Sequence, residues 1–149
     1  MVNSCISAMD VAKKLQSKFG KKVELAQRSP KRLYALVGKG DLPSVARFLF
    51  EELRARFCTA SAVDTRGGIE ILYHFFFDQI SLMVSVRTLL PKPSPQIESI
   101  APFLKGAEWI EREIADLFGV SFAGHPDPRR LILPDDWPEG EYPYLRRAD

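Results

Sequence analysis

The chain alternates between two hydrophobic periods, and this alternation predicts its secondary structure. In three segments apolar residues recur every three or four positions, the spacing of one face of an α-helix. The predicted helices cover residues 9–19, 41–57 and 106–118. The predicted core face of the second helix consists of Val45, Phe48, Leu49, Leu53 and Phe57. A further helical region is predicted from about Ile97, interrupted between Pro102 and Gly106.

Other segments alternate apolar and polar residues or run apolar throughout, which is typical of β-strands. The predicted strands cover residues 23–26, 33–37, 59–63, 69–77 and 80–89. Residues 69–77 are apolar on both sides, so both faces of this strand are expected to be covered. Helical and strand segments interleave within one short chain. The predicted fold is therefore α+β, a single domain with a mixed β-sheet and helices packed on it.

The last part of the chain differs in character from the rest. Residues 122–149 hold five prolines and many charges, and their one short apolar run is Leu131-Ile132-Leu133. Such a segment buries too little apolar surface to order itself. We therefore predict a core domain over residues 1–121, followed by an extended C-terminal arm over residues 122–149. In the isolated chain the arm is expected either to be disordered and more mobile than the sheet, or to gain order only by lying on another surface: a partner subunit, its own domain or a crystal neighbour.

The predicted helix within GAEWIEREIADLFG carries a tryptophan on its polar side. The polar side consists of Glu108, Trp109, Glu111, Arg112, Glu113 and Asp116. Arg112 lies four residues from both Glu108 and Asp116, and this spacing of ion pairs favours a solvated surface that includes Glu111. A tryptophan framed by charges is instead typical of a protein–protein interface. Paired carboxylates also leave a catalytic role open as a third interpretation.

Composition narrows the function classes. The chain has 149 residues, of which 46% are hydrophobic, and a formal net charge of only +2, so no global field favours nucleic acid. The longest apolar runs are about a third of the ~20 residues needed to cross a bilayer, and the N-terminus lacks the apolar core of a signal peptide. Cys5 and Cys58 lie far apart without a CxxC partner, which favours reduced thiols and a cytosolic setting.

One ordered motif runs through EWIEREIADLFGVSFAGHPDPRRLILPDDWPEGEYPYLRR. It resembles the hallmark segment of the thirty-kilodalton subunit family of respiratory complex I, also known as the C subunit of NADH-quinone oxidoreductase. That family's pattern runs W-x-E-R-E-x-x-D-L-F-G, then G-H-P, R-R, a hydrophobic triplet, an acidic-Trp step and a closing P-L-R. The matching residues are Trp109, Glu111, Arg112, Glu113, Asp116, Leu117, Phe118, Gly119, Gly124, His125, Pro126, Arg129, Arg130 and Trp137. A looser resemblance extends back to residue 33 and includes AVD at residues 62–64.

Two details refine the resemblance. Gly-Ala-Glu before Trp109 and the run LPDDWPEG are more similar to the version in energy-converting [NiFe] hydrogenases and formate hydrogenlyases than to complex I subunits. At the end, Tyr142-Pro143-Tyr144-Leu145-Arg146 has one residue more than the family's Pro-Leu-Arg. This departure leaves the conformation of the final part of the arm open.

The resemblance implies a non-catalytic scaffold subunit in the hydrophilic arm of a complex I-like oxidoreductase, which couples electron transfer to ion translocation. The implied partners are the large subunit, of the forty-nine-kilodalton or [NiFe] type, and a neighbouring Fe–S subunit, with no nucleic acid. Fe–S clusters and the NADH/FMN or [NiFe] centre would belong to partner subunits, and no cofactor to this chain. The implied location is the cytoplasmic side of the cell membrane, as a peripheral part of a complex without a membrane span of its own.

The motif and the resemblance together predict the residues of a partner interface. They are Trp109, Glu111, Arg112, Glu113, Asp116, His125, Arg129, Arg130, Trp137 and Arg146. No catalytic, cofactor-binding or metal residue is predicted. The alternative is a free-standing enzyme in which Glu113, Asp116 and His125 form an acid–base or metal site, although Glu-x-x-Asp plus one loop histidine is a weak metal-site pattern.

We expect the purified chain to be colourless and free of metal. Its two cysteines and two histidines are too widely spaced to form a closed ligand set for zinc or an iron–sulfur cluster. Elemental analysis after dialysis against a chelator checks this expectation. Stoichiometric iron, nickel or zinc in the dialysed protein would contradict it.

Overall fold

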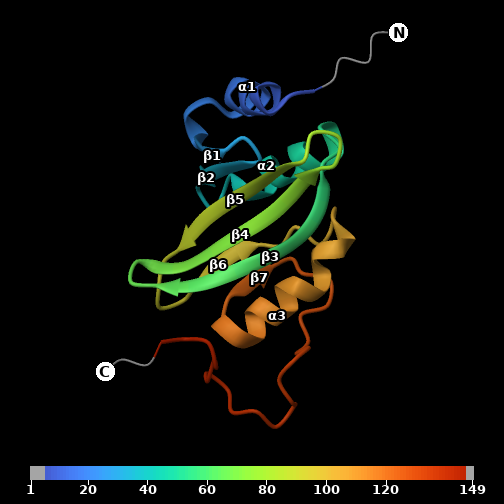
Figure 1. Ribbon diagram of the computed structural model, residues 1–149. Coiled ribbons are helices and arrows are strands. Elements are labelled where there is room, and N and C mark those ends of the chain that lie inside the picture. The colour runs from blue at the N-terminus through green and yellow to red at the C-terminus, as the bar shows by residue number, and fades with distance from the viewer. Residues whose placement is uncertain (1–5, 147–149) are drawn as a thin grey trace.

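A five-stranded sheet lies at the centre of the molecule. The computed structural model describes residues 6–146. The strands are β1 (Val23–Ser29), β2 (Arg32–Val37), β3 (Arg56–Thr65), β4 (Gly68–Phe77) and β5 (Leu82–Leu90). Their order across the sheet is β1-β2-β5-β4-β3 (Figure 1). The pair β2 and β5 is parallel and the other neighbours are antiparallel, so the predicted mixed sheet is confirmed.

Three α-helices accompany the sheet in the described part of the chain. Helix α1 (Ala8–Phe19) begins with a capping box, in which Ser7 and Asp10 each accept the backbone N–H of the other. Helix α2 (Leu42–Arg47) continues into a π-helical turn at Phe48–Glu52. Helix α3 (Glu108–Phe118) follows a short 3₁₀ turn at Lys105–Ala107. The first and third predicted helices are therefore confirmed.

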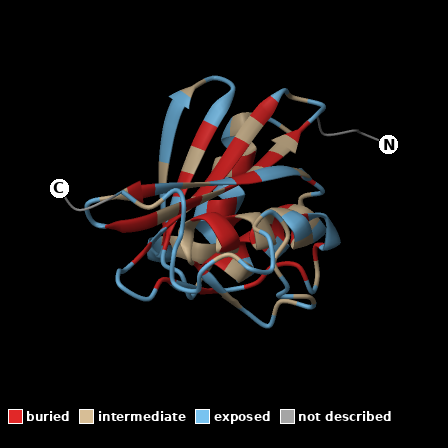
Figure 2. Cartoon of the chain, turned by 90° about the horizontal axis from the view of Figure 1, so that it is seen from below, coloured by how far each residue is buried: buried red, intermediate tan, exposed pale blue. Residues whose placement is uncertain are grey.

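The main core lies on one face of the sheet. Alternate residues of β4 point to this face and are buried, namely Ile69, Ile71, Tyr73, Phe75 and Phe77. Figure 2 shows the resulting alternation of buried and less buried residues along the strands. The other side of β4 carries Leu72, His74 and Phe76, which are half-buried. The prediction that both faces of this strand are covered is therefore wrong for the second face, which is partly open to solvent.

The second predicted helix is too long. It was expected to reach residue 57, but its helical part ends at Glu52 and Phe57 belongs to β3. Arg54 has a φ of +60°, a left-handed conformation that a right-handed helix cannot contain. Phe57 nevertheless contributes to the core, because its ring packs against those of Tyr73 and Phe75. The prediction that Phe57 is a core residue is therefore confirmed, whereas its assignment to a helix is wrong.

The helical region predicted from about Ile97 is also wrong. Residues Gln96–Glu98 form strand β6, which pairs in parallel with β7 (Ser121–Ala123). Ile97, Ile100 and Leu104 are all buried and happen to have helical spacing. Their side chains reach the core from a short strand and the turns after it. Buried residues can therefore have helical spacing in a segment that is not a helix.

The chain beyond β7 forms an arm without regular helix or strand over residues 124–146. The predicted boundary at residue 121 falls within β7. In Figure 1 the arm passes beside α3, at the end of the molecule opposite α1. Cys58 is exposed and free, and Cys5 lies outside the described residues. No helix within residues 6–146 has the length and apolar character to cross a membrane.

Gly68 provides a test of the sheet. Its φ is +145°, and a Cβ there would lie 2.2 Å from the backbone oxygen of Leu90 on the neighbouring strand. We expect Gly68→Ala to lower the free energy of unfolding by about 3 kcal/mol or more, because backbone on both sides would have to shift. Gly67→Ala is the matched control, since a Cβ at Gly67 meets only ordinary side-chain contacts at 3.4 Å or more. Equal urea stability of the two variants would contradict this account.

Candidate functional site

The motif residues of α3 fall on two sides of the helix, and Glu111 belongs to the buried side. Glu111 has no exposed surface. One carboxylate oxygen accepts the Tyr73 hydroxyl and the Ile100 backbone N–H, both at 3.0 Å, and the other accepts the Ser99 hydroxyl at 2.5 Å. Burial raises the pKa of Glu111, although these hydrogen bonds act in the opposite direction. The interpretation of Glu111 as part of a solvated surface is therefore wrong. It joins α3 to β4 and to the turn at residues 99–100.

His125 fixes the start of the arm against the first turn of α3. Its Nε2–H donates to the carbonyl of Glu108 at 2.9 Å, and its Nδ1 accepts the backbone N–H of Asp127 at 3.0 Å. This pattern of one donor and one acceptor selects the neutral imidazole. The side chain is only 2% exposed, with Nε2 3.9 Å from a carboxylate oxygen of Glu111. Both ring nitrogens are therefore engaged inside the chain.

Arg112 binds the arm through the backbone. Its guanidinium donates to the carbonyls of Arg129 at 2.8 Å and Arg130 at 3.0 Å, and it lies 3.7 Å from the carboxylate of Asp127. The predicted pairs of Arg112 with Glu108 and Asp116 are not among the ion pairs of residues 6–146. The guanidinium binds the arm instead, because the backbone carbonyls of Arg129 and Arg130 lie within hydrogen-bonding distance of it. The pattern of the helix alone does not indicate these acceptors.

Asp116 accepts three hydrogen bonds from the arm. One of its carboxylate oxygens accepts the backbone N–H groups of Leu131, Ile132 and Leu133, at 2.9, 2.8 and 3.1 Å. Successive N–H groups that converge on one oxygen form an anion-binding nest, here filled by a side chain of the same protein. Hydrogen bonds to an ionised acceptor are shorter and stronger than neutral ones. The apolar run of the arm is therefore held by its backbone.

The two arginines of the arm shape the loop that follows. Arg130 donates to the carbonyls of Pro134 and Trp137, at 2.9 and 2.8 Å, and the Trp137 indole N–H donates to the carbonyl of Glu141 at 3.0 Å. Arg129 pairs with Asp127 at 2.8 Å and holds the pKa of that carboxyl well below its usual range. Of these side chains, Arg129 remains largely exposed.

The end of the arm returns to the domain. The backbone N–H of Tyr144 donates to the carbonyl of Leu117 at 3.0 Å, and that of Arg146 donates to a carboxylate oxygen of Asp64 at 2.7 Å. The ring of Tyr144 contacts that of Phe118 edge-on, with centroids 5.6 Å apart. Asp64 was not among the predicted site residues. In the sequence, Asp64 was marked only by the AVD run at residues 62–64, which resembles the family. That resemblance did not indicate a role for Asp64.

Large apolar side chains remain exposed on α3 and on the arm. Trp109 is 69% exposed, as expected for the side of α3 away from the core. Ile132, Tyr142 and Tyr144 of the arm are 55%, 38% and 61% exposed. We call these four residues, three aromatic and one aliphatic, the aromatic surface. The side chain of Glu113, on the same helix, makes no hydrogen bond or ion pair with any described residue.

The arrangement does not suit the enzyme alternative. Glu113, Asp116 and His125 were to form an acid–base or metal site. Asp116 is engaged by three backbone N–H groups, and both nitrogens of the buried His125 have partners. Within residues 6–146 no three His, Cys, Asp or Glu side chains are grouped in a way that could hold a metal ion. The polar residues of the motif instead hold the arm on α3.

A family model described as "Respiratory-chain NADH dehydrogenase, 30 Kd subunit" matches residues 35–148. The chain belongs to this family. The matched range includes most of the sheet, the whole of α3 and the arm, so it contains the bonded motif residues described above. The resemblance found in the sequence is thereby confirmed.

Relatives within this family come from several kinds of complex. The C subunit of F420H2 dehydrogenase from Methanosarcina mazei is 33% identical, over 93% of this chain and 89% of its own length. The C subunit of NADH-quinone oxidoreductase from Chloroherpeton thalassium is 32% identical, over 83% of this chain and 54% of its own length. Formate hydrogenlyase subunit 5 of Escherichia coli K12 is 33% identical, over 68% of this chain and 19% of its own length. The identities to relatives of the complex I type and of the hydrogenase type are thus nearly equal.

A solved structure agrees with the family assignment. A chain of the membrane-bound sulfane sulfur reductase, an archaeal respiratory membrane complex, superposes with a TM-score of 0.80 and 25% identity. The superposition covers 92% of this chain and 82% of that one. Like that chain, members of the thirty-kilodalton subunit family occur in multisubunit complexes.

Asp116 provides a test of how this member of the family holds its arm. We expect Asp116→Ala to lower the free energy of unfolding by about 1–3 kcal/mol, because three N–H groups lose their shared acceptor. Amide exchange at Leu131, Ile132 and Leu133 should accelerate, while exchange in β4 stays slow. Glu113→Ala is the matched control and should change stability by less than about 0.5 kcal/mol. Unchanged exchange at residues 131–133 would show that the nest does not hold the arm.

Proposed function

We propose that this chain is a non-catalytic scaffold subunit that packs on the large subunit of a complex I-like oxidoreductase. The observation that carries the proposal is the use of the polar motif residues. Arg112, Asp116 and Arg130 bind backbone groups of the arm and so set its path along α3. The side chains left exposed beside that path are the aromatic surface. Tryptophan and tyrosine are the residues most enriched at the energetic centres of protein interfaces.

The fixed arm suits a docking role for a second reason. Ordering a free segment on binding costs backbone entropy of roughly 1–2 kcal/mol per residue, which weakens association. Here the arm is already bonded to its own domain from His125 to Arg146. The predicted interface residues Glu111, Arg112, Asp116, His125 and Arg130 therefore contribute mainly by holding the surface. Trp109, Arg129 and the exposed side chains of the arm would meet the partner directly.

The lengths of the relatives support a role beside a larger polypeptide. The match with formate hydrogenlyase subunit 5 covers only 19% of that protein. In that relative a domain of this type is thus joined covalently to a much longer chain. We infer that this chain makes the equivalent contact between separate subunits.

The proposal places the redox chemistry outside this chain. Fe–S clusters and the NADH/FMN or [NiFe] centre would lie in the large subunit and a neighbouring Fe–S subunit, and this chain would hold none of them. Electron transfer through those subunits would be coupled to ion translocation. The complex would place the chain on the cytoplasmic side of the cell membrane. The hydrogenase branch indicated by Gly-Ala-Glu before Trp109 stays a prediction.

Truncation tests the proposal. A chain lacking residues 126–149 should keep its sheet, because the main core residues come from segments before the arm. It should no longer co-purify with the large subunit when both are expressed in the host organism. Circular dichroism confirms the fold, and the ratio of large subunit to tagged chain measures assembly. Full assembly by a folded truncated chain would exclude the arm as the docking element.

Point variants separate the aromatic surface from exposed apolar residues in general. Trp109→Ala and Tyr144→Ala should each weaken assembly by about tenfold or more, as for residues at the centre of an interface. Val63→Ala is the matched control, since Val63 is 47% exposed but lies on the open face of the sheet. Equal effects of the three variants would argue against a specific surface.

A further inference from the structure

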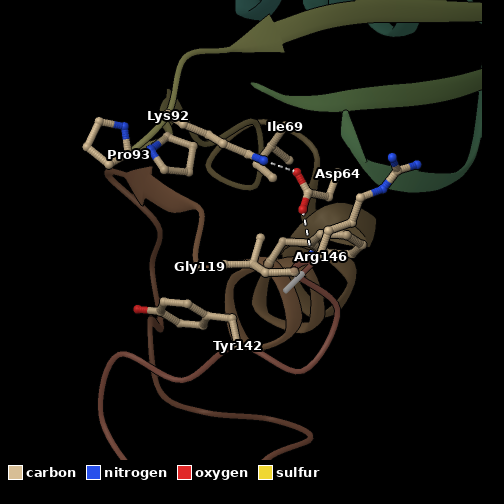
Figure 3. A pocket seen from close by; sticks show the side chains of 10 residues that line it. Asp64, Ile69, Lys92, Pro93, Gly119, Tyr142 and Arg146 are labelled. Atoms are coloured by element: carbon tan, nitrogen blue, oxygen red, sulfur yellow. Dashed lines mark hydrogen bonds and ion pairs between the residues drawn. The ribbon is translucent and has the colours of Figure 1, made fainter. Parts of the chain in front are cut away.

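The end of the arm is attached to a buried carboxylate of the sheet. Asp64, on β3, is only 4% exposed. One of its oxygens accepts the backbone N–H of Arg146, 82 residues further along the chain, at 2.7 Å. The other oxygen pairs with the ammonium of Lys92, which follows β5. Figure 3 shows Lys92 and Arg146 reaching this carboxylate from two sides. The contact thus joins β3, the segment after β5 and the arm.

The same region contains a cavity of about 280 Å³. Its walls come from the beginning of β4, the proline-rich segment after β5, the end of α3 and the arm. Ile69, Pro93, Phe118 and Leu145 supply the apolar lining, and Asp64 and Lys92 the polar part. The arm forms one side of this cavity. Its last described residues therefore cover a partly apolar hollow at the end of the sheet.

Gly119 allows the arm to pass the end of α3. Its φ is +73°, the left-handed conformation common at helix ends, and its N–H donates to the carbonyl of Ala115. A Cβ at this position would lie 2.6–2.9 Å from three ring carbons of Tyr142. Any larger residue would therefore displace the Tyr142 ring as well as strain the helix end.

We propose that Asp64, Lys92 and Gly119 form a latch that holds residues 142–146 in the conformation in which the arm meets its partner. The inference rests on the proposed docking function and adds the positioning residues for it. None of the three latch residues belongs to the predicted interface. Asp64 and Lys92 come from parts of the chain far from the motif. Asp64 lies in the AVD run and Gly119 in the motif that resemble the family, and both residues hold the end of the arm.

The atoms used by the latch favour positioning over simple packing. The bonds at Tyr144 and Arg146 involve their backbone N–H groups, so both side chains remain available. Leu145 packs against the core, while Tyr144, the residue additional to the family's Pro-Leu-Arg, is 61% exposed. The latch therefore accommodates the extra residue by turning its ring outward. The exposed part of Tyr144 thus stays available to a partner.

The effect on binding follows from the population of the latched state. If only a fraction of molecules holds the docking conformation, the apparent dissociation constant rises by the inverse of that fraction. A variant whose arm is latched for about one-tenth of the time should bind about tenfold more weakly. The loss comes without removal of any side chain that touches the partner.

Asp64→Ala is the principal test variant, with Val63→Ala as its neighbour control on the same strand. Lys92 is 43% exposed, so water can solvate its ammonium once the carboxylate is gone. Hydrogen exchange in the isolated full chain reports the latch through the Tyr144 and Arg146 amides. Binding to the purified large-subunit assembly of the same organism, prepared without this chain, reports docking. We expect exchange at both amides to become about tenfold faster and the dissociation constant to rise about tenfold in Asp64→Ala, with no change in Val63→Ala.

A second pair of variants tests the latch without touching Asp64. Gly119→Ala should release the arm through the clash with Tyr142, whereas Gly119→Ala combined with Tyr142→Ala removes the clash and should restore slow exchange at Arg146. Faster exchange with unchanged affinity would overturn the inference, and so would unchanged exchange in Asp64→Ala. If the chain lacking residues 126–149 still binds fully, the proposed function fails. If truncation abolishes binding but Asp64→Ala does not weaken it, only the latch inference fails.

Discussion

The position of the arm depends on one charge-assisted contact, the carboxylate of Asp116 within three successive backbone N–H groups. The arm has too few apolar residues to bury itself, so dispersion and the hydrophobic effect cannot fix its path. A single ionised side chain on a rigid helix supplies three directional bonds to the apolar run at residues 131–133. With this run in place, Arg130 lies where it can order the next loop through the carbonyls of Pro134 and Trp137.

Helix α3 thus connects two parts of the molecule that differ in physical character. On one side it is joined to an apolar core, with the carboxylate of Glu111 satisfied by hydroxyl and amide donors in a buried site. On the other side it holds a polar segment by hydrogen bonds to backbone atoms. A buried polar group without a hydrogen-bond partner lowers the stability of the fold, so both sets of contacts require their donors and acceptors at defined positions. Each of these contacts therefore requires its residue, Glu111, Arg112 or Asp116, at one particular position of the helix.

Local pattern was sufficient for most of the sheet and for two of the three helices, because the period of the apolar residues reports which side is buried. It failed where burial and backbone conformation diverge, as at Ile97, which has helical spacing relative to Ile100 and Leu104 but lies in a strand. It also failed for Glu111, whose donors Tyr73 and Ser99 lie 38 and 12 residues away. Asp64 and Arg146 are 82 residues apart, and no local pattern indicates that they meet. The family resemblance identified the motif residues, but not that most of them bind within the chain.

The separation between Asp64 and Arg146 also has a consequence for the order in which the protein is made. All five strands of the sheet end by Leu90, so their backbone pairing, including the parallel pair, can form as soon as β5 has been synthesised. The contact between Asp64 and Arg146 requires more than fifty further residues to emerge from the ribosome. A nascent chain can therefore complete its sheet while the arm is still unattached. The buried core is complete with Val120, so the domain can fold before its arm is attached.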